Sequence, residues 1–312
     1  MPNIEFYYAS QEPRTRLLYF NLMTELSLAL VLFSGLTHAS WNLLLKNSHN
    51  QEVFIWWLKI TISVMLAPIA VILIWNDGIE STGWWFILGT SLIHILYYLF
   101  LSRSYMHADL SLVYPLARGT GPVLTAFLGI TLLSETISEL AILGIMAVVL
   151  GIFVIYWWGH ISEVFDDPLK FVKNPGVRYA LLTGLTISLY SVWDKVGVNY
   201  VNPLLYMYLL SLGTALGLAP YIIRQYGTSA IKKELVSNKI RIVSSALLAF
   251  GTYATILSVL QLSKVSYVAP AREIGIVFSV LLGSIILKES MSIGRIIGSL
   301  IITIGVFLIG IG

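Results

Sequence analysis

Two arginines lie well inside long apolar stretches of this sequence, where charged side chains are rare. Arg118 falls within Leu110–Leu133 and Arg272 within Val265–Leu287. A buried Arg at the centre of a membrane helix costs roughly 2.5 to 3.5 kcal/mol on insertion scales, so each needs a polar cavity or a partner. In a cavity, a guanidinium binds carboxylate or phosphate groups. The alternative is that each Arg pairs with backbone carbonyls or an acid and locks helix packing.

Both arginines occupy the same position in an internal repeat, in which Leu116–Ser138 matches Pro270–Ser292. A fainter match aligns Gly35, Leu36, Thr37 and Lys46 with Gly184, Leu185, Thr186 and Lys195. The chain is therefore predicted to consist of two related halves. Identical pairs in the stronger match and the segment after it are Ala117/Ala271, Arg118/Arg272, Gly121/Gly275, Val123/Val277, Leu128/Leu282, Gly129/Gly283, Leu133/Leu287, Glu135/Glu289, Ser138/Ser292, Gly144/Gly298, Gly151/Gly305 and Phe153/Phe307.

A proline precedes each arginine within one helical turn, at Pro115 and Pro270. Proline frees backbone carbonyls and loosens a helix, and broken membrane helices often border binding sites. Glu273 follows Arg272 directly, but neighbouring helical residues point about 100° apart. Glu273 is therefore expected to need a partner other than Arg272.

Polar and aromatic residues on the other segments are candidates for the rest of a binding site. His38, Asn42 and Lys46 recur every four residues and so share one helix face, with Trp41 beside it. The alternative for His38 and Asn42 is hydrogen bonding that holds helices together. The candidate substrate-binding residues are Arg118, Arg272, His38, Trp41, Asn42, Tyr114, Tyr190, Trp193 and Tyr267.

Three ionisable residues are candidates for carrying a coupling proton: His94, Glu273 and Asp194. An imidazole titrates near physiological pH, although a lone His is more often a satisfied polar residue. Lys59 lies closer to an end of its segment and is expected to extend toward the headgroups. The repeated acids Glu135 and Glu289 end their helices and are expected to make structural helix-end contacts.

Composition indicates a membrane protein, because the chain is 57% hydrophobic and 11% charged and has a mean hydropathy of +0.82. Spanning helices need about 20 apolar residues each. The sequence predicts an all-α membrane protein with ten transmembrane helices. The expected spans are Leu26–Leu45, Val53–Trp75, Trp84–Leu101, Leu110–Leu133, Leu140–Trp158, Gly176–Val198, Leu204–Ile223, Ile242–Leu262, Val265–Leu287 and Ile293–Ile311.

The expected organisation is an N-terminal extension (1–24), a first repeat (25–158), a linker (159–175) and a second repeat (176–312). Met23 directly precedes the first span and is a candidate start. Residues 224–241 are expected to form a solvated loop. Each repeat holds five helices, an odd number, so the second must enter the membrane inverted. Inverted repeats are a recurrent architecture of secondary transporters that work by alternating access.

The sequence contains no Cys, which excludes disulfides and thiolate metal sites. It also lacks an HExxH, GxSxG or Walker motif, and no cluster of carboxylates has metal-ligand spacing, so no enzyme activity, cofactor or metal is expected. A receptor would need a docking segment, for which the soluble stretches are too short. The expected partners are a small-molecule substrate, the lipid bilayer and a second copy in a homodimer, without nucleic acid.

The repeated pattern ARGTGPVLTAFLGITLLSE and AREIGIVFSVLLGSIILKE resembles the drug/metabolite transporter (DMT) superfamily, most closely its EamA-type members. The resemblance implies ten helices in two repeats, with the first four helices of each around a substrate cavity and the fifth and tenth outside. It implies transport without fixing a substrate. Members are usually drawn with both termini in the cytoplasm. The Lys and Arg residues concentrate in the even-numbered loops, which favours the opposite orientation.

The sequence thus predicts a secondary transporter or facilitator, in the plasma membrane, for a small organic anion or zwitterion such as an amino acid, organic acid or phosphate-bearing metabolite. The alternative is an exporter of lipophilic or cationic drugs, which would need a membrane-embedded acid such as Glu273 or Asp194. A flippase for lipid-linked sugars and a membrane-embedded enzyme are more distant alternatives.

Overall fold

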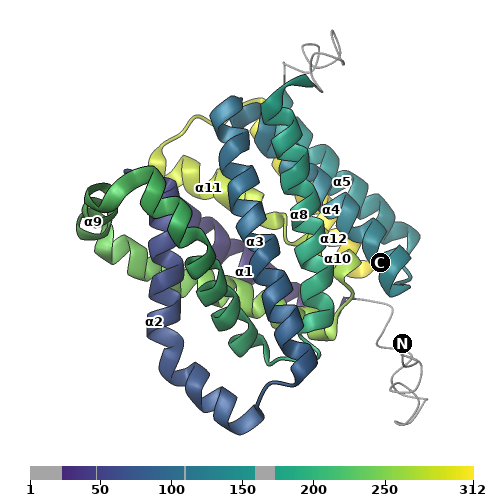
Figure 1. Cartoon of the computed structure of the whole chain (residues 1–312). Coiled ribbons are helices and arrows are strands. Elements are labelled where there is room, and N and C mark those ends of the chain that lie inside the picture. Colours follow the sequence, from purple (N-terminus) through teal and green to yellow (C-terminus); the bar gives the residue numbers. More distant parts are fainter. Residues whose placement is uncertain (1–22, 47, 109, 159–172) are drawn as a thin grey trace, which may run out of the picture.

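The computed structural model describes residues 23–46, 48–108, 110–158 and 173–312, and every regular element in this part is an α-helix (Figure 1). Most of the expected N-terminal extension and linker lie outside the described residues. The helices are α1 (Glu25–Lys46), α2 (Gln51–Asp77), α3 (Ser81–His107), α4 (Leu110–Leu133), α5 (Glu139–Trp157), α8 (Pro175–Gly197), α9 (Pro203–Leu262), α10 (Val265–Ala271), α11 (Ile274–Leu287) and α12 (Ile293–Ile311).

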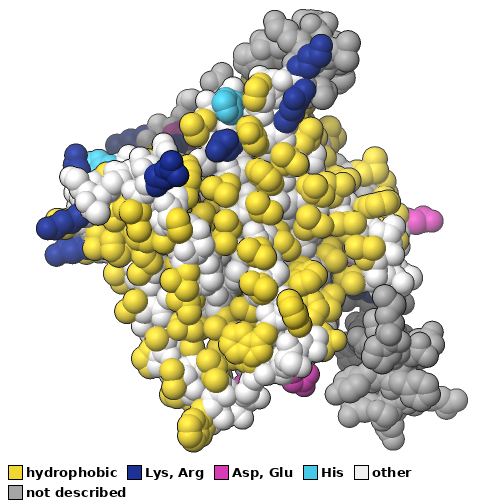
Figure 2. All heavy atoms as spheres, viewed as in Figure 1, with side chains coloured by type: hydrophobic (Ala, Val, Ile, Leu, Met, Phe, Trp, Pro, Cys, Tyr) yellow, Lys and Arg dark blue, Asp and Glu magenta, His cyan; other side chains and the backbone are white. Residues whose placement is uncertain are grey.

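Eight helical segments among the described residues are long and apolar enough to cross a membrane. They include α9 as one segment of 60 residues and Val265–Leu287, which joins α10 and α11. The helix α8 is not among them, since it is rich in Ser, Thr and Tyr. Hydrophobic side chains cover most of the surface in Figure 2. The chain is therefore an all-helical, multi-pass integral membrane protein.

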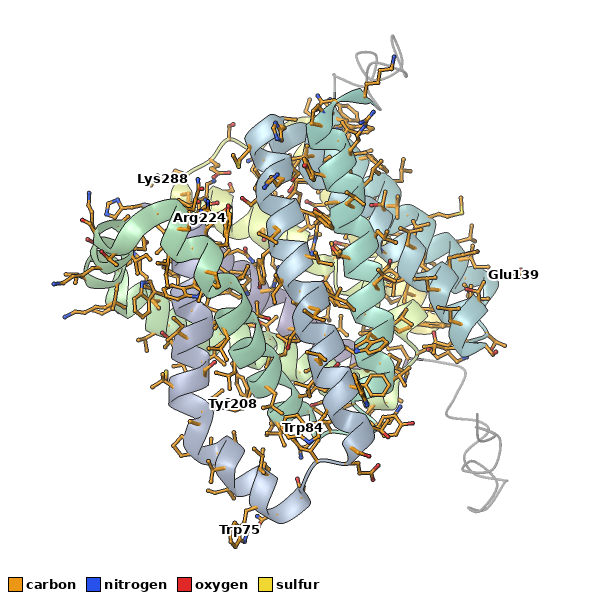
Figure 3. All side chains as sticks on the ribbon, viewed as in Figure 1. Trp75, Trp84, Glu139, Tyr208, Arg224 and Lys288 are labelled. Carbon is orange, nitrogen blue, oxygen red and sulfur yellow. The ribbon has the colours of Figure 1, made fainter. Side chains whose placement is uncertain are left out.

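The two ends of the helix bundle differ in chemistry. Arg224 and Lys288 lie at one end, which we call the basic end, and Trp75 and Trp84 lie at the opposite end, the aromatic end (Figure 3). Lys and Arg side chains also gather over the upper part of the surface in Figure 2. Trp75 is 87% exposed and Trp84 50%, as expected for tryptophans at the level of the headgroups.

Residues 224–241 are helical, so the expectation of a solvated loop there is wrong. They form the middle of α9, which bends where Gly227 and Asn238 leave helical geometry. Gly227 has a φ of 69°, a left-handed conformation that glycine adopts without strain. Buried Glu234 anchors this bend, because its carboxylate accepts hydrogen bonds from the Asn50 backbone N–H and the Asn238 amide.

The two repeated arginine helices fold differently. Pro115 and Pro122 leave α4 continuous. In the second half, the helix stops at Ala271, shortly after Pro270, and resumes at Ile274. Arg272 and Glu273 therefore lie at the break between α10 and α11. The proline argument predicts a loosened helix beside both arginines, and the structure has one only in the second half.

Close helix contacts recur in equivalent pairs between the two halves. A Cβ on Gly144 would lie 2.6 Å from the Gly305 carbonyl oxygen, and one on Gly298 would lie 2.6 Å from that of Gly151. These four glycines let the backbones of α5 and α12 touch, side by side at the right of Figure 1. Likewise, Gly35 leaves no room for a Cβ beside Ile274 of α11, nor does Gly184 beside Thr120 of α4.

The aromatic end is tied together across the two halves. The Glu135 carboxylate accepts hydrogen bonds from the backbone N–H groups of Val265 (2.9 Å) and Ser266 (3.0 Å), in the first turn of α10. The Ser266 hydroxyl donates to the same carboxylate at 2.6 Å. The Lys264 ammonium donates to the Thr136 carbonyl at 2.7 Å. Accordingly, α4 packs against α10 and makes little contact with α11, so these helices separate toward the basic end.

Candidate functional site

Arg118 forms a buried ion pair across the two halves. Its guanidinium Nη2 lies 2.9 Å from Oε2 of Glu273, and both side chains are less than one tenth exposed. Glu273 thus has a partner other than its neighbour Arg272. The pair connects the middle of α4 to the break between α10 and α11. Arg118 Nε is also buried and has no hydrogen-bond partner.

Arg272 has a different environment. Its Nη2 donates to the Tyr190 hydroxyl at 3.3 Å, and its guanidinium carbon lies 5.8 Å from the centre of the Tyr253 ring. Among the described residues, no carboxylate lies within ion-pair distance of it. Arg272 is half-buried although Ala271 and Glu273 beside it are buried. A hydroxyl and an aromatic face compensate a full charge only in part.

The candidates on α1 lie near the arginines but bond mainly to each other. The His38 and Trp41 rings meet edge to face with centroids 5.2 Å apart. The Asn42 amide donates to the His38 carbonyl at 2.8 Å. His38 lies within electrostatic range of both Arg118 and Arg272. It is therefore the α1 residue that the fold brings to the arginine pair.

Asp194 is fully buried and held by tyrosines. The Tyr206 hydroxyl donates to its Oδ1 at 2.7 Å, and the Tyr253 hydroxyl donates to its Oδ2. His94 is also buried and stacks on Tyr190, with centroids 4.4 Å apart. Tyr190 and Tyr253 both contact Arg272, so they connect these two coupling candidates to the unpaired guanidinium.

Three aromatic candidates lie apart from these contacts. Trp193 donates its indole N–H to the Phe86 carbonyl at 2.9 Å and packs on α3. The Tyr267 hydroxyl accepts from the Ser138 backbone N–H at 3.0 Å and joins α10 to the start of α5. Tyr114 packs against Tyr156 of α5 at 5.1 Å, although it lies within electrostatic range of Arg118.

The repeated acids sit at opposite ends of the bundle. At the aromatic end, Glu135 binds the first turn of α10, as described above. At the basic end, Glu289 forms ion pairs with Lys46 and Arg295. Those two cations stabilise the ionised form and hold the pKa of Glu289 below its usual range, with the Lys46 hydrogen bond the larger cause. Both acids make helix-end contacts in this structure.

Sequence reasoning missed two kinds of site residue. Tyr206 and Tyr253 gave no signal, because no motif connects either of them to Asp194. Lys59 was expected to extend toward the headgroups, which is wrong, since it is 6% exposed and its ammonium lies 5.8 Å from the centre of the Tyr98 ring. Lys59 lies on the third turn of α2, and that position could have indicated that it is buried inside the bundle. No cluster of three or more potential metal ligands occurs in the described part of the chain.

The fold has two related halves with arginines at equivalent positions, and the helix is interrupted at one of them. The model of the EamA-like transporter family matches residues 25–157 and 174–311, which together cover most of the chain. The chain belongs to the EamA-like transporter family. This EamA-like protein is thus a membrane transporter of the drug/metabolite transporter superfamily, and the family model matches it twice.

Solved structures also resemble this EamA-like chain: 28 chains match it. One, described only as "Crystal structure of protein", superimposes with a TM-score of 0.69 over 90% of this chain and 97% of its own length. The two are 16% identical, so the likeness shows a shared fold alone. None of the curated proteins compared with the EamA-like chain matches it.

Proposed function

We propose that this protein is a secondary transporter or facilitator that moves a small organic anion or zwitterion across the cell membrane, with Arg272 as the group that binds it. The observation that supports this proposal most directly is the contrast between the two repeated arginines. Arg118 is neutralised by Glu273, whereas the described part of the chain offers Arg272 a tyrosine hydroxyl and an aromatic ring but no acid. A guanidinium without an acid inside a membrane protein is suited to an anionic ligand.

Partial exposure inside the bundle supports the same site. Arg272, His38, Tyr114 and Tyr253 are half-buried, although the segments that carry them pack on other helices. Side chains in such positions keep accessible surface when they border an internal space.

We propose that transport proceeds by alternating access between two inverted repeats. In this proposal α8 and the two halves of α9 bring the number of membrane crossings to ten. Each repeat then has five crossings, an odd number, so the second repeat enters the membrane inverted. The recurring glycine contacts support a symmetry axis between the halves. The contacts of Glu135 close the aromatic end, whereas α4 and α11 separate toward the basic end. The other state would close the basic end instead.

The remaining candidates take secondary roles in this proposal. His38, Trp41 and Asn42 would line the α1 side of the path, Tyr190 would orient Arg272, and Tyr114 would lie beside Arg118. Trp193 and Tyr267 would hold helices in place. His94 and Asp194 are candidates for a coupling proton, because each is buried next to a tyrosine that contacts Arg272.

Thermal unfolding of the purified full chain in detergent tests the anion site. The panel contains butyrate, succinamate, succinate, glutamate, 2-phosphoglycolate and the lipophilic cation tetraphenylphosphonium. We expect one of the anions, or glutamate with its additional ammonium group, to raise the melting temperature of the wild type. Arg272→Gln should abolish that shift without lowering the unliganded melting temperature. Arg295→Gln is the matched control, because that Arg lies at the basic end, and its shift should persist.

Two results would overturn the proposal. One is an anion-induced shift that survives Arg272→Gln. The other is a shift with tetraphenylphosphonium alone, which would favour an exporter of lipophilic cations.

A further inference from the structure

A further cation inside the bundle has no acid partner among the described residues. Lys59 of α2 is 6% exposed. Its ammonium lies over Tyr98, and no carboxylate of the described residues is within ion-pair distance. A cation–π contact compensates the burial of an ammonium only in part. A group in this state is ready to bind an anion.

An open groove at the basic end lies close to Lys59. The groove has a volume of about 370 Å³ and is lined by α2, α3 and α9, with Ile55 and Tyr98 among its walls. Lys59 follows Ile55 by four residues, so it lies on the same face of α2, one turn or about 6 Å further inside. On α3, His94 lies one turn inside Tyr98 for the same reason. Lys59 and His94 therefore lie one helical turn beyond the inner lining of the groove.

One aromatic cluster separates Lys59 from Arg272. The ammonium of Lys59 lies over the Tyr98 ring, whose centroid is 4.9 Å from that of Tyr97. The centroids of the Tyr97 and Tyr190 rings are 6.0 Å apart. Tyr190 in turn accepts the hydrogen bond of Arg272. His94 stacks on Tyr190 and lies within electrostatic range of both cations. The two cations therefore flank the same ring cluster from α2 and from the break after α10.

The nearby acids already have partners, including Glu52 in the groove, whose Oε2 accepts hydrogen bonds from the hydroxyls of Tyr221 and Tyr226. Glu273 pairs with Arg118, and both carboxylate oxygens of Asp194 accept tyrosine hydroxyls. A ligand ammonium would therefore meet two cations, and every carboxylate described beside them or in the groove already has a partner. This balance favours a ligand with two anionic groups over an amino acid.

We propose that Lys59 is a second substrate-binding group and that the substrate is an organic dianion, with one anionic group at Arg272 and the other at Lys59. The inference rests on the proposed anion transport and narrows its substrate class. Candidate classes are dicarboxylates and phosphorylated carboxylates. Removal of Lys59 should then change which anion the protein prefers, while Arg272 continues to hold the first anionic group.

Three four-carbon probes of nearly equal size test this charge preference: succinate carries two anionic groups, succinamate one, and 4-aminobutyrate is a zwitterion. Glutarate and 2-phosphoglycolate extend the dianion class. Affinities are measured by titrating the melting temperature of the full-length protein in detergent. We expect at least one dianion to bind about tenfold more tightly than succinamate, and 4-aminobutyrate to bind more weakly than any dianion.

The variants separate charge from fold. In Lys59→Met, the preference for a dianion over succinamate should fall to within about twofold, whereas Lys59→Arg should retain it. Lys232→Met is the control, because it removes an exposed positive charge of α9, and it should behave like the wild type. Loss of an uncompensated buried charge should leave the unliganded melting temperature of Lys59→Met unchanged or higher.

The outcomes distinguish this inference from the proposed function. Binding of succinamate that depends on Arg272, without a preference for dianions, overturns the role of Lys59 and leaves anion transport standing. Persistence of the dianion preference in Lys59→Met has the same meaning. Absence of binding by every anion tested overturns both proposals.

Discussion

Glu273 crosses from the second half of the chain to neutralise Arg118 in the first, at an Nη2–Oε2 distance of 2.9 Å. In the repeat alignment the position equivalent to Glu273 is Gly119, which has no side chain to offer Arg272. Two arginines of common origin therefore have different electrostatic surroundings, and that difference leads to the first prediction.

Arg118→Gln should destabilise the protein by about 3 to 5 kcal/mol, because it leaves the Glu273 carboxylate buried and unpaired. The double variant Arg118→Gln/Glu273→Gln should recover most of that loss. Unfolding in detergent of the single variants and the double variant measures the coupling energy. Losses that simply add would show that the pair contributes nothing as a pair.

Glu135→Gln should destabilise by about 1 to 3 kcal/mol, because a partly buried carboxylate that accepts three hydrogen bonds loses its charge and part of its acceptor capacity. Glu289→Gln, at the equivalent position, should cost no more than about 1 kcal/mol, since its ion pairs are partly exposed. The free energies of unfolding of the two variants give the comparison. Equal losses would contradict the difference between the two ends.

The Glu289 ion pairs should make stability depend on pH in the acid range. Lys46 and Arg295 hold the pKa of Glu289 below its usual range. The stabilisation is therefore complete above the ordinary glutamate value of about 4.3 and is lost as the pH falls through the lower folded-state value. The melting-temperature difference between wild type and Glu289→Gln should shrink as the pH falls from about 5 to about 3. A difference that stays constant over this range would refute the effect.

Gly144→Ala should destabilise by about 1 to 3 kcal/mol, because its Cβ would lie 2.6 Å from the Gly305 carbonyl oxygen and neither backbone can move aside without strain. Gly251→Ala in α9 is the matched control. No atom lies within 4 Å of a Cβ at Gly251, so alanine there should leave stability unchanged or raise it by up to about 1 kcal/mol. Melting temperatures in detergent test both, and similar effects at the two positions would contradict the close contact.

Much of the fold could be predicted because apolar length and repetition are strong signals. The expected spans Leu26–Leu45 and Ile293–Ile311 fall almost where α1 and α12 do. The need of Glu273 for a distant partner followed from helix geometry alone. Buried charges in a membrane must be compensated, so even one sequence indicates where charged partners are required.

The rest depended on three-dimensional packing. The polar run 224–241 has the composition of a loop, yet it forms the bent middle of α9, where buried Glu234 accepts a hydrogen bond from Asn50 just before α2. Trp193 and Tyr190 lie three residues apart on α8, but one packs on α3 and the other faces Arg272. Which face of α8 points inward depends on its neighbours, and the pattern of a helix rich in small polar residues does not indicate it.

The glycine contacts between α5 and α12 also bear on how such a chain originated. Each half ends in a helix that carries one side of the same self-complementary clasp, Gly144 and Gly151 meeting Gly305 and Gly298. An ancestor of one half alone would have carried both sides of that clasp and could pair with an oppositely inserted copy of itself. Gene fusion would then have joined two halves that already fit one another.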